Sequence, residues 1–389
     1  MGKNHSLLGN IQSFARKGSD PTWGSSRCRP YNGQRFLTIL LVHFALKSHH
    51  VAKEDTFGTD WDALPAFYPD RATYLLNKAR ATISKWLHPE SSETRASTQC
   101  SAMRNKAWGL IGDSILRNQV QSLICLLSKA DEPVEVYHDK EFKNRRWHFQ
   151  SYNFTVSLVW APFLVKSEVF ENENGESTSE IQLHLDILEP TWISQYERFD
   201  YVVIAGGQWF LKTAVYWESG KVLGCHHCQD KNLTEVGFEH LYRRTLQEVL
   251  KFISSAHHKP VVLFRTWAPD HFENGEWFSG GTCNRVLPYK KGEYGGKYME
   301  HIMRGIELEE FNKAVTAANS SRDAVKLKLL DTYSISSMRP DGHAGPYRMF
   351  HPFAQGNKDG SSVQNDCLHW CVPGPIDAWN DLIMKLVLN

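Results

Sequence analysis

The sequence lacks an excess of charge of either sign. Lysine and arginine together number 44, and aspartate and glutamate 43, among 389 residues. Such a balance gives no whole-protein field that would recruit nucleic acid or an anionic membrane. We therefore expect no nucleic-acid partner, and a partner that is uncharged or only locally charged.

Long apolar runs are also absent. The best one, Phe36–Leu46, contains His43 and is shorter than the roughly 20 apolar residues that a membrane span requires. It also begins too far along the chain for a cleavable signal peptide. Basic residues precede the run, as they would on the cytoplasmic side of an anchor. Two interpretations stay open: the run is a short membrane anchor, or it is a buried strand or helix segment.

Regular structure is sparse in the first part of the chain. Residues 1–102 show no sustained hydrophobic period apart from Phe36–Leu46 and a possible helix over residues 71–87. We predict that residues 1–102 are an irregular N-terminal region and that residues 103–389 form one α/β domain. Within this domain, the hydrophilic stretch Glu168–Glu180 is predicted to be a surface insertion. No internal repeat is present.

From residue 106 onward, short apolar runs alternate with amphipathic segments. Trp108–Ile111 is typical of a buried strand, and a helical face follows it directly, formed by Leu116, Val120, Leu123 and Leu127. Further predicted strands are Phe154–Trp160, Tyr201–Ala205, Val261–Arg265 and Val325–Leu330, and further predicted helices are Glu235–Ser255, Tyr298–Ala318 and Ile376–Leu388. This alternation indicates an α/β fold, a three-layer α/β/α sandwich with a mostly parallel sheet.

The eight cysteines are an even number, and most of them lie beside turns and loops. This pattern favours disulfides and an oxidising compartment. The candidates for pairing are Cys125, Cys225, Cys228, Cys283, Cys367 and Cys371. The spacing of Cys225-His-His-Cys228 is also that of half a zinc site. A closed site that used Cys367 and Cys371 as its other half would distort the segment between them, so we expect no bound metal.

Gly112, Asp113 and Ser114 follow the first predicted strand, and a helix is predicted to begin at Ile115. The Ser114 hydroxyl then projects at a helix N-terminus, where backbone N–H groups could stabilise the oxyanion of an acyl-transfer intermediate. Asp and Ser are also ordinary residues at the start of a helix, so the tripeptide alone leaves a purely structural role open.

Asp366 and His369 lie three residues apart in a predicted loop that enters the last helix. At this spacing the carboxylate can orient the imidazole and fix its tautomer, while the other ring nitrogen faces a hydroxyl. His369 would be the general base and Asp366 its orienting partner. The loops of Ser114 and His369 both follow carboxyl ends of strands, where open α/β folds place their sites. The three residues therefore form a candidate catalytic triad.

Other polar and aromatic residues are candidates for substrate binding. Arg117 could contact an oxygen of the acyl group or the acyl donor, Asn118 could donate to the oxyanion, and the backbone N–H of Gly207 is a second candidate oxyanion donor. A solvated helix face for Arg117 and Asn118, and a plain turn at Gly207, stay open as alternatives. Three further residues are candidates for lining the substrate cleft, each with a structural role as its alternative: His271, His343 and Trp370.

Five ordered blocks of the sequence stand out: Gly112–Gln119, Phe264–Phe272, Trp277–Cys283, Met338–His343 and Asp366–Pro375. They read GDSILRNQ, FRTWAPDHF, WFSGGTC, MRPDGH and DCLHWCVPGP. Together they resemble the trichome-birefringence-like family of plant polysaccharide O-acetyltransferases, and the resemblance runs from about Met103 to the last residue.

The resemblance implies an SGNH/GDSL-like esterase core and a type II Golgi membrane protein with a lumenal catalytic domain that acetylates hemicellulose or pectin. It also implies that Ser114 takes the acetyl group and that His369, oriented by Asp366, then activates a sugar hydroxyl. The expected co-substrate is an acetyl donor such as acetyl-CoA, with no bound cofactor. Met338–His343 and Gly224–Cys228 are most similar to members linked with xyloglucan and mannan. Xyloglucan is the favoured acceptor, with mannan or xylan as alternatives.

The N-terminal region departs from the family pattern. The family carries a cysteine-rich segment with Trp-x-Pro and Leu-Pro-Arg-Phe elements, and neither is recognisable in residues 1–102. Cys125 is therefore expected to be unpaired or joined to Cys100 or Cys28. Two other functions stay open: a polysaccharide acetylesterase that uses the same triad, and a wall-glycan binding protein without catalytic activity.

Overall fold

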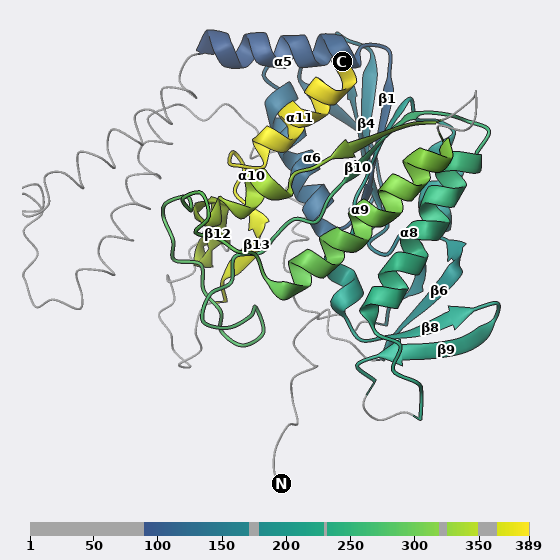
Figure 1. The fold of residues 1–389 in the computed structure, drawn as a ribbon. Helices are drawn as coiled ribbons and strands as arrows, with labels where there is room; N and C mark the ends of the chain where they lie inside the picture. Colours follow the sequence, from purple (N-terminus) through teal and green to yellow (C-terminus); the bar gives the residue numbers. More distant parts are fainter. Residues whose placement is uncertain (1–88, 171–178, 229–231, 319–324, 349–363, 389) are drawn as a thin grey trace, which may run out of the picture.

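A seven-stranded sheet forms the centre of the computed structural model, which describes residues 89–170, 179–228, 232–318, 325–348 and 364–388 (Figure 1). Its strands, in the order in which they lie side by side, are β11 (Lys326–Leu330), β10 (Val261–Arg265), β7 (Tyr201–Ile204), β1 (Ala107–Gly112), β4 (Phe154–Trp160), β3 (Arg145–Phe149) and β2 (Pro133–His138). The strands from β11 to β4 run parallel, whereas β3 and β2 add to the edge in antiparallel pairs.

Helices cover both faces of this sheet (Figure 1). One face carries α5 (Pro89–Met103), α6 (Ser114–Leu127) and α11 (Asp377–Leu388), and the other carries α7 (Pro190–Tyr196), α8 (Phe238–Ser255) and α9 (Tyr298–Ala318). Alternate residues of β7 show the division, because Val202 and Ile204 belong to the core under α8 and α9, while Val203 belongs to the core under α6. The predicted three-layer α/β/α sandwich with a mostly parallel sheet is confirmed.

Smaller elements surround this core. A separate four-stranded sheet has the order β5 (Val165–Glu168), β6 (Ile181–Leu188), β8 (Ala214–Glu218) and β9 (Lys221–His226). A two-stranded sheet pairs β12 (His343–Gly345) with β13 (Asp366–Trp370). The short helices are η3 (Gln208–Leu211), α10 (Tyr333–Ser337), η4 (Pro340–Gly342) and η5 (Pro346–Arg348). The predicted insertion at Glu168–Glu180 connects β5 to β6, and its middle lies outside the described residues.

Helix α5 corrects the prediction that the whole of residues 1–102 is irregular. Its buried face repeats at Ala96, Gln99, Cys100 and Met103, which are at most 4% exposed. Cys100 and Met103 pack into the core beneath α6, so the α/β domain includes this helix. The spacing is helical, but most side chains of this helix are small or polar and give little hydrophobic contrast, so hydrophobic periodicity does not predict it.

The candidate anchor Phe36–Leu46 and the candidate helix over residues 71–87 both lie outside the described residues. Within the described part of the chain, no helix combines the length and the apolar character needed to cross a bilayer.

The packing of α5 predicts that Met103→Ala destabilises the domain. Met103 is 0% exposed, so truncation should lower the free energy of unfolding by about 2–5 kcal/mol through lost burial and the cavity left behind. Chemical denaturation measures this loss. The control is Thr98→Ala on the exposed face of the same helix, for which we expect a change within about 0.5 kcal/mol. Equal effects of the two substitutions would show that α5 does not belong to the core.

Candidate active site

Ser114 is the first residue of α6 and follows β1 after a turn of one residue. The turn lies directly against the end of β7, since a Cβ atom built at Gly112 would come within 2.2 Å of the Ala205 carbonyl oxygen. Only glycine fits this approach. Ser114 is half-buried and follows the carboxyl end of β1, the edge of the sheet where the predicted site lies.

Asp113 caps α6 and takes up most of the N–H donors of its first turn. Its Oδ1 accepts hydrogen bonds from the N–H groups of Ile115, at 3.0 Å, and Leu116, at 3.2 Å. Burial raises the pKa of this carboxyl, and the nearby Arg265 guanidinium opposes that rise. These two N–H groups are therefore engaged within the protein, so the predicted set of oxyanion donors at this helix start is corrected to exclude them. The N–H of Ser114 itself stays a candidate donor.

Asp366 and His369 are in direct contact, as their spacing predicts. His369 Nδ1 lies 3.2 and 3.1 Å from the two carboxylate oxygens of Asp366, and the His369 backbone N–H donates to Asp366 Oδ1 at 2.9 Å. Asp366 is 2% and His369 9% exposed. The carboxylate thus fixes both the ring and the main chain of His369 in a nearly dry environment. The two residues lie on β13, a strand, instead of the predicted loop.

Asn118 joins the helix of Ser114 to the strand of His369. Its Nδ2 donates to the Trp370 carbonyl at 3.1 Å, and its Oδ1 accepts from the Trp370 N–H at 2.7 Å. Asn118 lies four residues, about one helical turn, after Ser114, and Trp370 follows His369. The predicted role of Asn118 as an oxyanion donor is therefore replaced by a structural one, because its amide already binds main chain through both ends.

The two residues next to Ser114, Asp113 and Ile115, interact with His369 or its neighbour Trp370. Ile115 belongs to the same buried apolar cluster as Trp370, together with Ala268 and Trp379. On the other side of Ser114, the Asp113 carboxylate interacts electrostatically with His369. The residues on either side of Ser114 thus interact with His369 or with its neighbour Trp370. The contact between Ser114 and His369 that a triad requires stays a prediction.

The loop after β7 lies beside the turn that carries Ser114, because the end of β7 packs against Gly112. Gly207 has φ +145°, and a Cβ atom there would come within 2.7 Å of the Trp267 ring, so the position requires glycine. Gln208 donates through Nε2 to the Ala268 carbonyl at 2.7 Å, which ties this loop to the segment after β10. β7 is the immediate neighbour of β1, so the Gly207 N–H stays a candidate oxyanion donor.

Arg117 is half-buried, and its guanidinium lies 5.2 Å from the centroid of the Trp160 ring. Trp160 ends β4 and is the register partner of Gly112 on β1. A cation over an aromatic face beside the nucleophile turn is compatible with the predicted role of Arg117 in substrate binding.

Trp370, His343 and His271 do not line a cleft. They are 3%, 7% and 3% exposed and form a packed group, in which the Trp370 ring lies 4.3 Å from that of His343. His343 donates through Nδ1 to the His369 carbonyl at 2.9 Å, and its Nε2 lies 2.7 Å from His271 Nδ1. Burial lowers the pKa of His343 to about 3. These residues support the main chain of His369, and the predicted place in the acceptor cleft is replaced by packing.

The Cys283–Cys367 disulfide holds the strand that carries the acid–base pair, because Cys367 lies next to Asp366 on β13. Cys125 is also disulfide-bonded, whereas Cys100 is a buried free cysteine and is not its partner. Neither disulfide whose two halves are both described includes Cys371, so that candidate is not confirmed.

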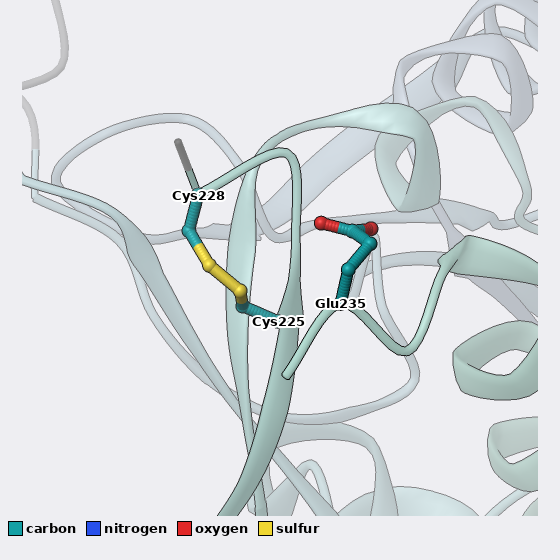
Figure 2. A group of neighbouring side chains, drawn as sticks. All are labelled: Cys225, Cys228 and Glu235. Atoms are coloured by element: carbon teal, nitrogen blue, oxygen red, sulfur yellow. A yellow bond between two sulfur atoms is a disulfide. The ribbon is translucent and has the colours of Figure 1, made fainter. Parts of the chain in front are cut away.

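Cys225 and Cys228 are joined as well, at the end of β9 (Figure 2). Their sulfur atoms and a Glu235 oxygen lie within 4.8 Å of one another, which makes this the one group of metal-ligand type among the described residues. Cysteine binds a metal as the thiolate. Because Cys225 and Cys228 are joined in a disulfide, they supply no thiolate, and their bond is a covalent restraint at the end of β9.

A buried polar network beneath the site was not predicted. Arg265 at the end of β10, Tyr242 on α8 and Glu307 on α9 are each at most 1% exposed. Arg265 interacts electrostatically with Asp113, Glu307 and Tyr242. The sequence did hold a signal, because Glu307 falls on the apolar face of its helix, between Met303 and Phe311, where a charge requires a partner.

A serine at a helix start after β1, a buried Asp–His pair and a mostly parallel sheet with helices on both faces are compatible with an SGNH/GDSL-like fold. Sequence comparison agrees, since residues 95–386 match PC-Esterase, described as a GDSL/SGNH-like acyl-esterase family found in Pmr5 and Cas1p. The chain belongs to the PC-esterase family.

The relatives carry more specific names. Protein trichome birefringence-like 25 of Arabidopsis thaliana is 55% identical over 74% of this chain and 63% of its own length. Xyloglucan O-acetyltransferase 1 of Arabidopsis thaliana is 42% identical over 73% of this chain and 65% of its own length. Xyloglucan O-acetyltransferase 1 of Populus trichocarpa is 41% identical over 73% and 66%. The chain thus spans just under two thirds of the length of these curated relatives.

The junction at Asn118 predicts a loss of stability in Asn118→Ala. The substitution leaves the buried N–H and carbonyl of Trp370 without partners, which costs roughly 1–3 kcal/mol in free energy of unfolding. Chemical denaturation tests this against Gln121→Ala, a half-buried position of the same helix. Two losses of the same size would argue against the junction.

Removal of the Cys283–Cys367 disulfide should destabilise the domain by about 2–5 kcal/mol, because this bond links residues 84 apart in sequence. The matched control is removal of Cys225–Cys228, which links residues only 3 apart and should cost less. Serine pairs at each position, compared by denaturation without reductant, give the two values. A larger loss for Cys225–Cys228 would contradict the expected ranking.

Proposed function

We propose that the chain is an O-acetyltransferase that moves acetyl groups onto hydroxyls of a plant cell-wall polysaccharide through an acetyl-serine intermediate. One observation carries this proposal: the buried Asp366–His369 pair is held against the helix that begins at Ser114. A nucleophile, a base and the group that orients the base are the parts that covalent acyl transfer requires.

In the first step, Ser114 Oγ attacks the acetyl carbonyl carbon of the donor while His369 Nε2 takes the serine proton. The N–H groups of Ser114 and Gly207 are the candidate donors to the oxyanion of the tetrahedral intermediate. Collapse of this intermediate leaves the acetyl group on Ser114, and the leaving group departs with the proton from His369. Asp366 keeps the imidazole in the tautomer that has Nε2 available.

In the second step, a sugar hydroxyl attacks the acetyl-serine carbonyl and gives its proton to His369. The ester passes to the sugar, and Ser114 Oγ recovers the proton from His369. The chemistry balances without an oxidant, a metal or a bound cofactor. We propose an acetyl donor such as acetyl-CoA as co-substrate.

The acceptor class follows from the relatives. Two proteins that are 41–42% identical to this chain are named xyloglucan O-acetyltransferases, while the names of those at 52–55% identity state no acceptor. We propose a hemicellulose acceptor. Xyloglucan, mannan and xylan oligosaccharides are the three candidates to compare in an assay. The family likeness also supports a Golgi membrane location with the catalytic domain in the lumen.

A second candidate function is hydrolysis of acetyl esters, because the matching family is described as acyl-esterase. Water then takes the place of the sugar hydroxyl in the second step. The residues of the site are the same for both reactions, and only the exclusion of water distinguishes them.

The triad predicts the kinetics of its variants. Ser114→Ala and His369→Gln should each lower kcat on the order of 10³–10⁶-fold, the double variant should lose little more than either single one, and Asp366→Asn should lose somewhat less. Ser194→Ala, at an exposed serine of α7, is the control and should retain wild-type kcat. Additive losses in the double variant would mean that the two residues do not act together.

Mass spectrometry with a labelled acetyl donor tests the reaction itself. We expect label first on the peptide that contains Ser114 and then on one of the three oligosaccharides. Label only in free acetate would establish the esterase. Serine-independent labelling, or binding of oligosaccharide without turnover, would overturn both reactions and favour a glycan-binding protein.

A further inference from the structure

Glu307 is a fully buried carboxylate that accepts two short hydrogen bonds. The Tyr242 hydroxyl donates to its Oε1 at 2.6 Å, and the Trp267 backbone N–H donates to its Oε2 at 2.7 Å. Glu307 is 0% exposed, and it lies on α9, which contributes no residue of the triad. Burial of a carboxyl group is costly unless it is hydrogen-bonded or paired, and these two bonds supply partners for both of its oxygens.

Both partners of Glu307 contact the loop that holds the candidate oxyanion donor. The Tyr242 hydroxyl lies 3.4 Å from the Gly206 carbonyl oxygen. The Trp267 ring packs against Gly207 so closely that a Cβ atom there would approach it to 2.7 Å. Glu307 thus fixes two groups that touch the peptide unit joining Gly206 to Gly207.

The Tyr242 hydroxyl has one hydrogen and faces two acceptors, Glu307 Oε1 and the Gly206 carbonyl. When Glu307 is ionised, the hydrogen goes to Oε1. When Glu307 is protonated, the proton sits on Oε1, because Oε2 receives the Trp267 N–H. The acid then donates to the tyrosine oxygen, and the tyrosine hydrogen turns to Gly206.

The charges around Glu307 come from several elements. Arg265 on β10 and Arg304 on α9 favour its ionised form, as do its two hydrogen-bond donors. Burial outweighs them and raises the pKa of Glu307 to about 7. The Asp113 carboxylate, at the start of α6, interacts with Tyr242 and Arg265 from the side of the nucleophile. Both protonation states are therefore accessible near neutral pH.

We propose that Glu307 is a positioning residue for the oxyanion loop, acting through Tyr242 on the Gly206–Gly207 peptide. A hydrogen bond to the Gly206 carbonyl holds this peptide and polarises it, which strengthens the Gly207 N–H as a donor. The protonated form of Glu307 is the one that supports the reaction. This inference rests on the proposed acyl transfer, and it adds a control of that site by a residue outside the triad.

Glu307→Gln tests the inference because an amide reproduces the protonated pattern at every pH. Its oxygen accepts the Trp267 N–H, and its NH2 group donates to the tyrosine oxygen, so the tyrosine hydrogen points at Gly206. The control is Glu310→Gln, on the same helix and 4% exposed, whose carboxylate binds Arg243 and Lys313 instead. All variants are assayed as full chains with p-nitrophenyl acetate as the acetyl donor, over a pH range on both sides of the pKa of Glu307.

We expect kcat of the wild type and of Glu310→Gln to fall on the order of tenfold as pH rises through about 7. This loss is smaller than the roughly 10²–10³-fold effect of deleting a donor. In Glu307→Gln, this fall of kcat at alkaline pH (the alkaline limb of the pH profile) should be absent. Its KM and the change of kcat at acidic pH should equal those of the wild type. An alkaline limb that persists in Glu307→Gln overturns the inference while serine-dependent turnover still supports the triad. No serine-dependent turnover in the wild type overturns the proposed function instead.

Tyr242→Phe and thermal melting give independent readouts. Without the hydroxyl, kcat should be low at all pH values and the alkaline limb should be lost. The folded-state pKa of Glu307 is raised from 4.5 to about 7, so its contribution to stability is fully present below pH 4.5 and is lost as pH rises through 7. The Tm of the wild type should therefore fall relative to that of Glu307→Gln over this window. Parallel Tm curves would contradict the buried titration.

Discussion

The pair of hydrogen bonds between Asn118 and the main chain of Trp370 is the interaction on which the rest of the site depends. The two residues are 252 positions apart in sequence, and their contact joins the first turn of α6 to β13. Among the described residues β13 pairs with one strand, β12, and the Asn118 amide satisfies the N–H and carbonyl of Trp370. Ser114 and the Asp366–His369 pair are therefore held together by this contact, although different parts of the chain supply them.

Hydrophobic periodicity predicted the five parallel strands of the central sheet, but not its edge strands β3 and β2. β4, β10 and α9 have the bounds that were expected. The buried face of α9 nevertheless combines apolar residues such as Met303 and Phe311 with Glu300, Glu307 and Glu310. The four-stranded sheet was not predicted. Its strand β6 alternates buried Ile181, Leu183 and Leu185 with partly exposed residues, a pattern typical of a strand. It directly follows a hydrophilic stretch, and only that stretch was predicted, as a surface insertion. Helix α5 was missed because the residues it buries are small or polar, so local pattern fails where packing depends on size instead of hydrophobicity.

The site divides in the same way. The sequence predicts Ser114, Asp366 and His369 as a triad because spacing, motif and position on the predicted sheet agree, and the structure confirms the contact between the last two. It misassigned Asn118 and Trp370 because the use of an amide or an indole depends on what tertiary structure places opposite it. No motif predicts Glu307, for a related reason. Its proposed role depends on Tyr242 and on Trp267, which tertiary structure places beside it.

The Cys283–Cys367 bond also makes the restraint of β13 dependent on the redox environment. One half of this bond is next to Asp366, while the other comes from a segment 84 residues earlier, so this covalent link exists only after oxidation. Under reducing conditions β13 keeps its hydrogen bonds to Asn118 and its pairing with β12, but not the link. The redox state of the surroundings therefore sets how firmly the segment that carries Asp366 and His369 is held.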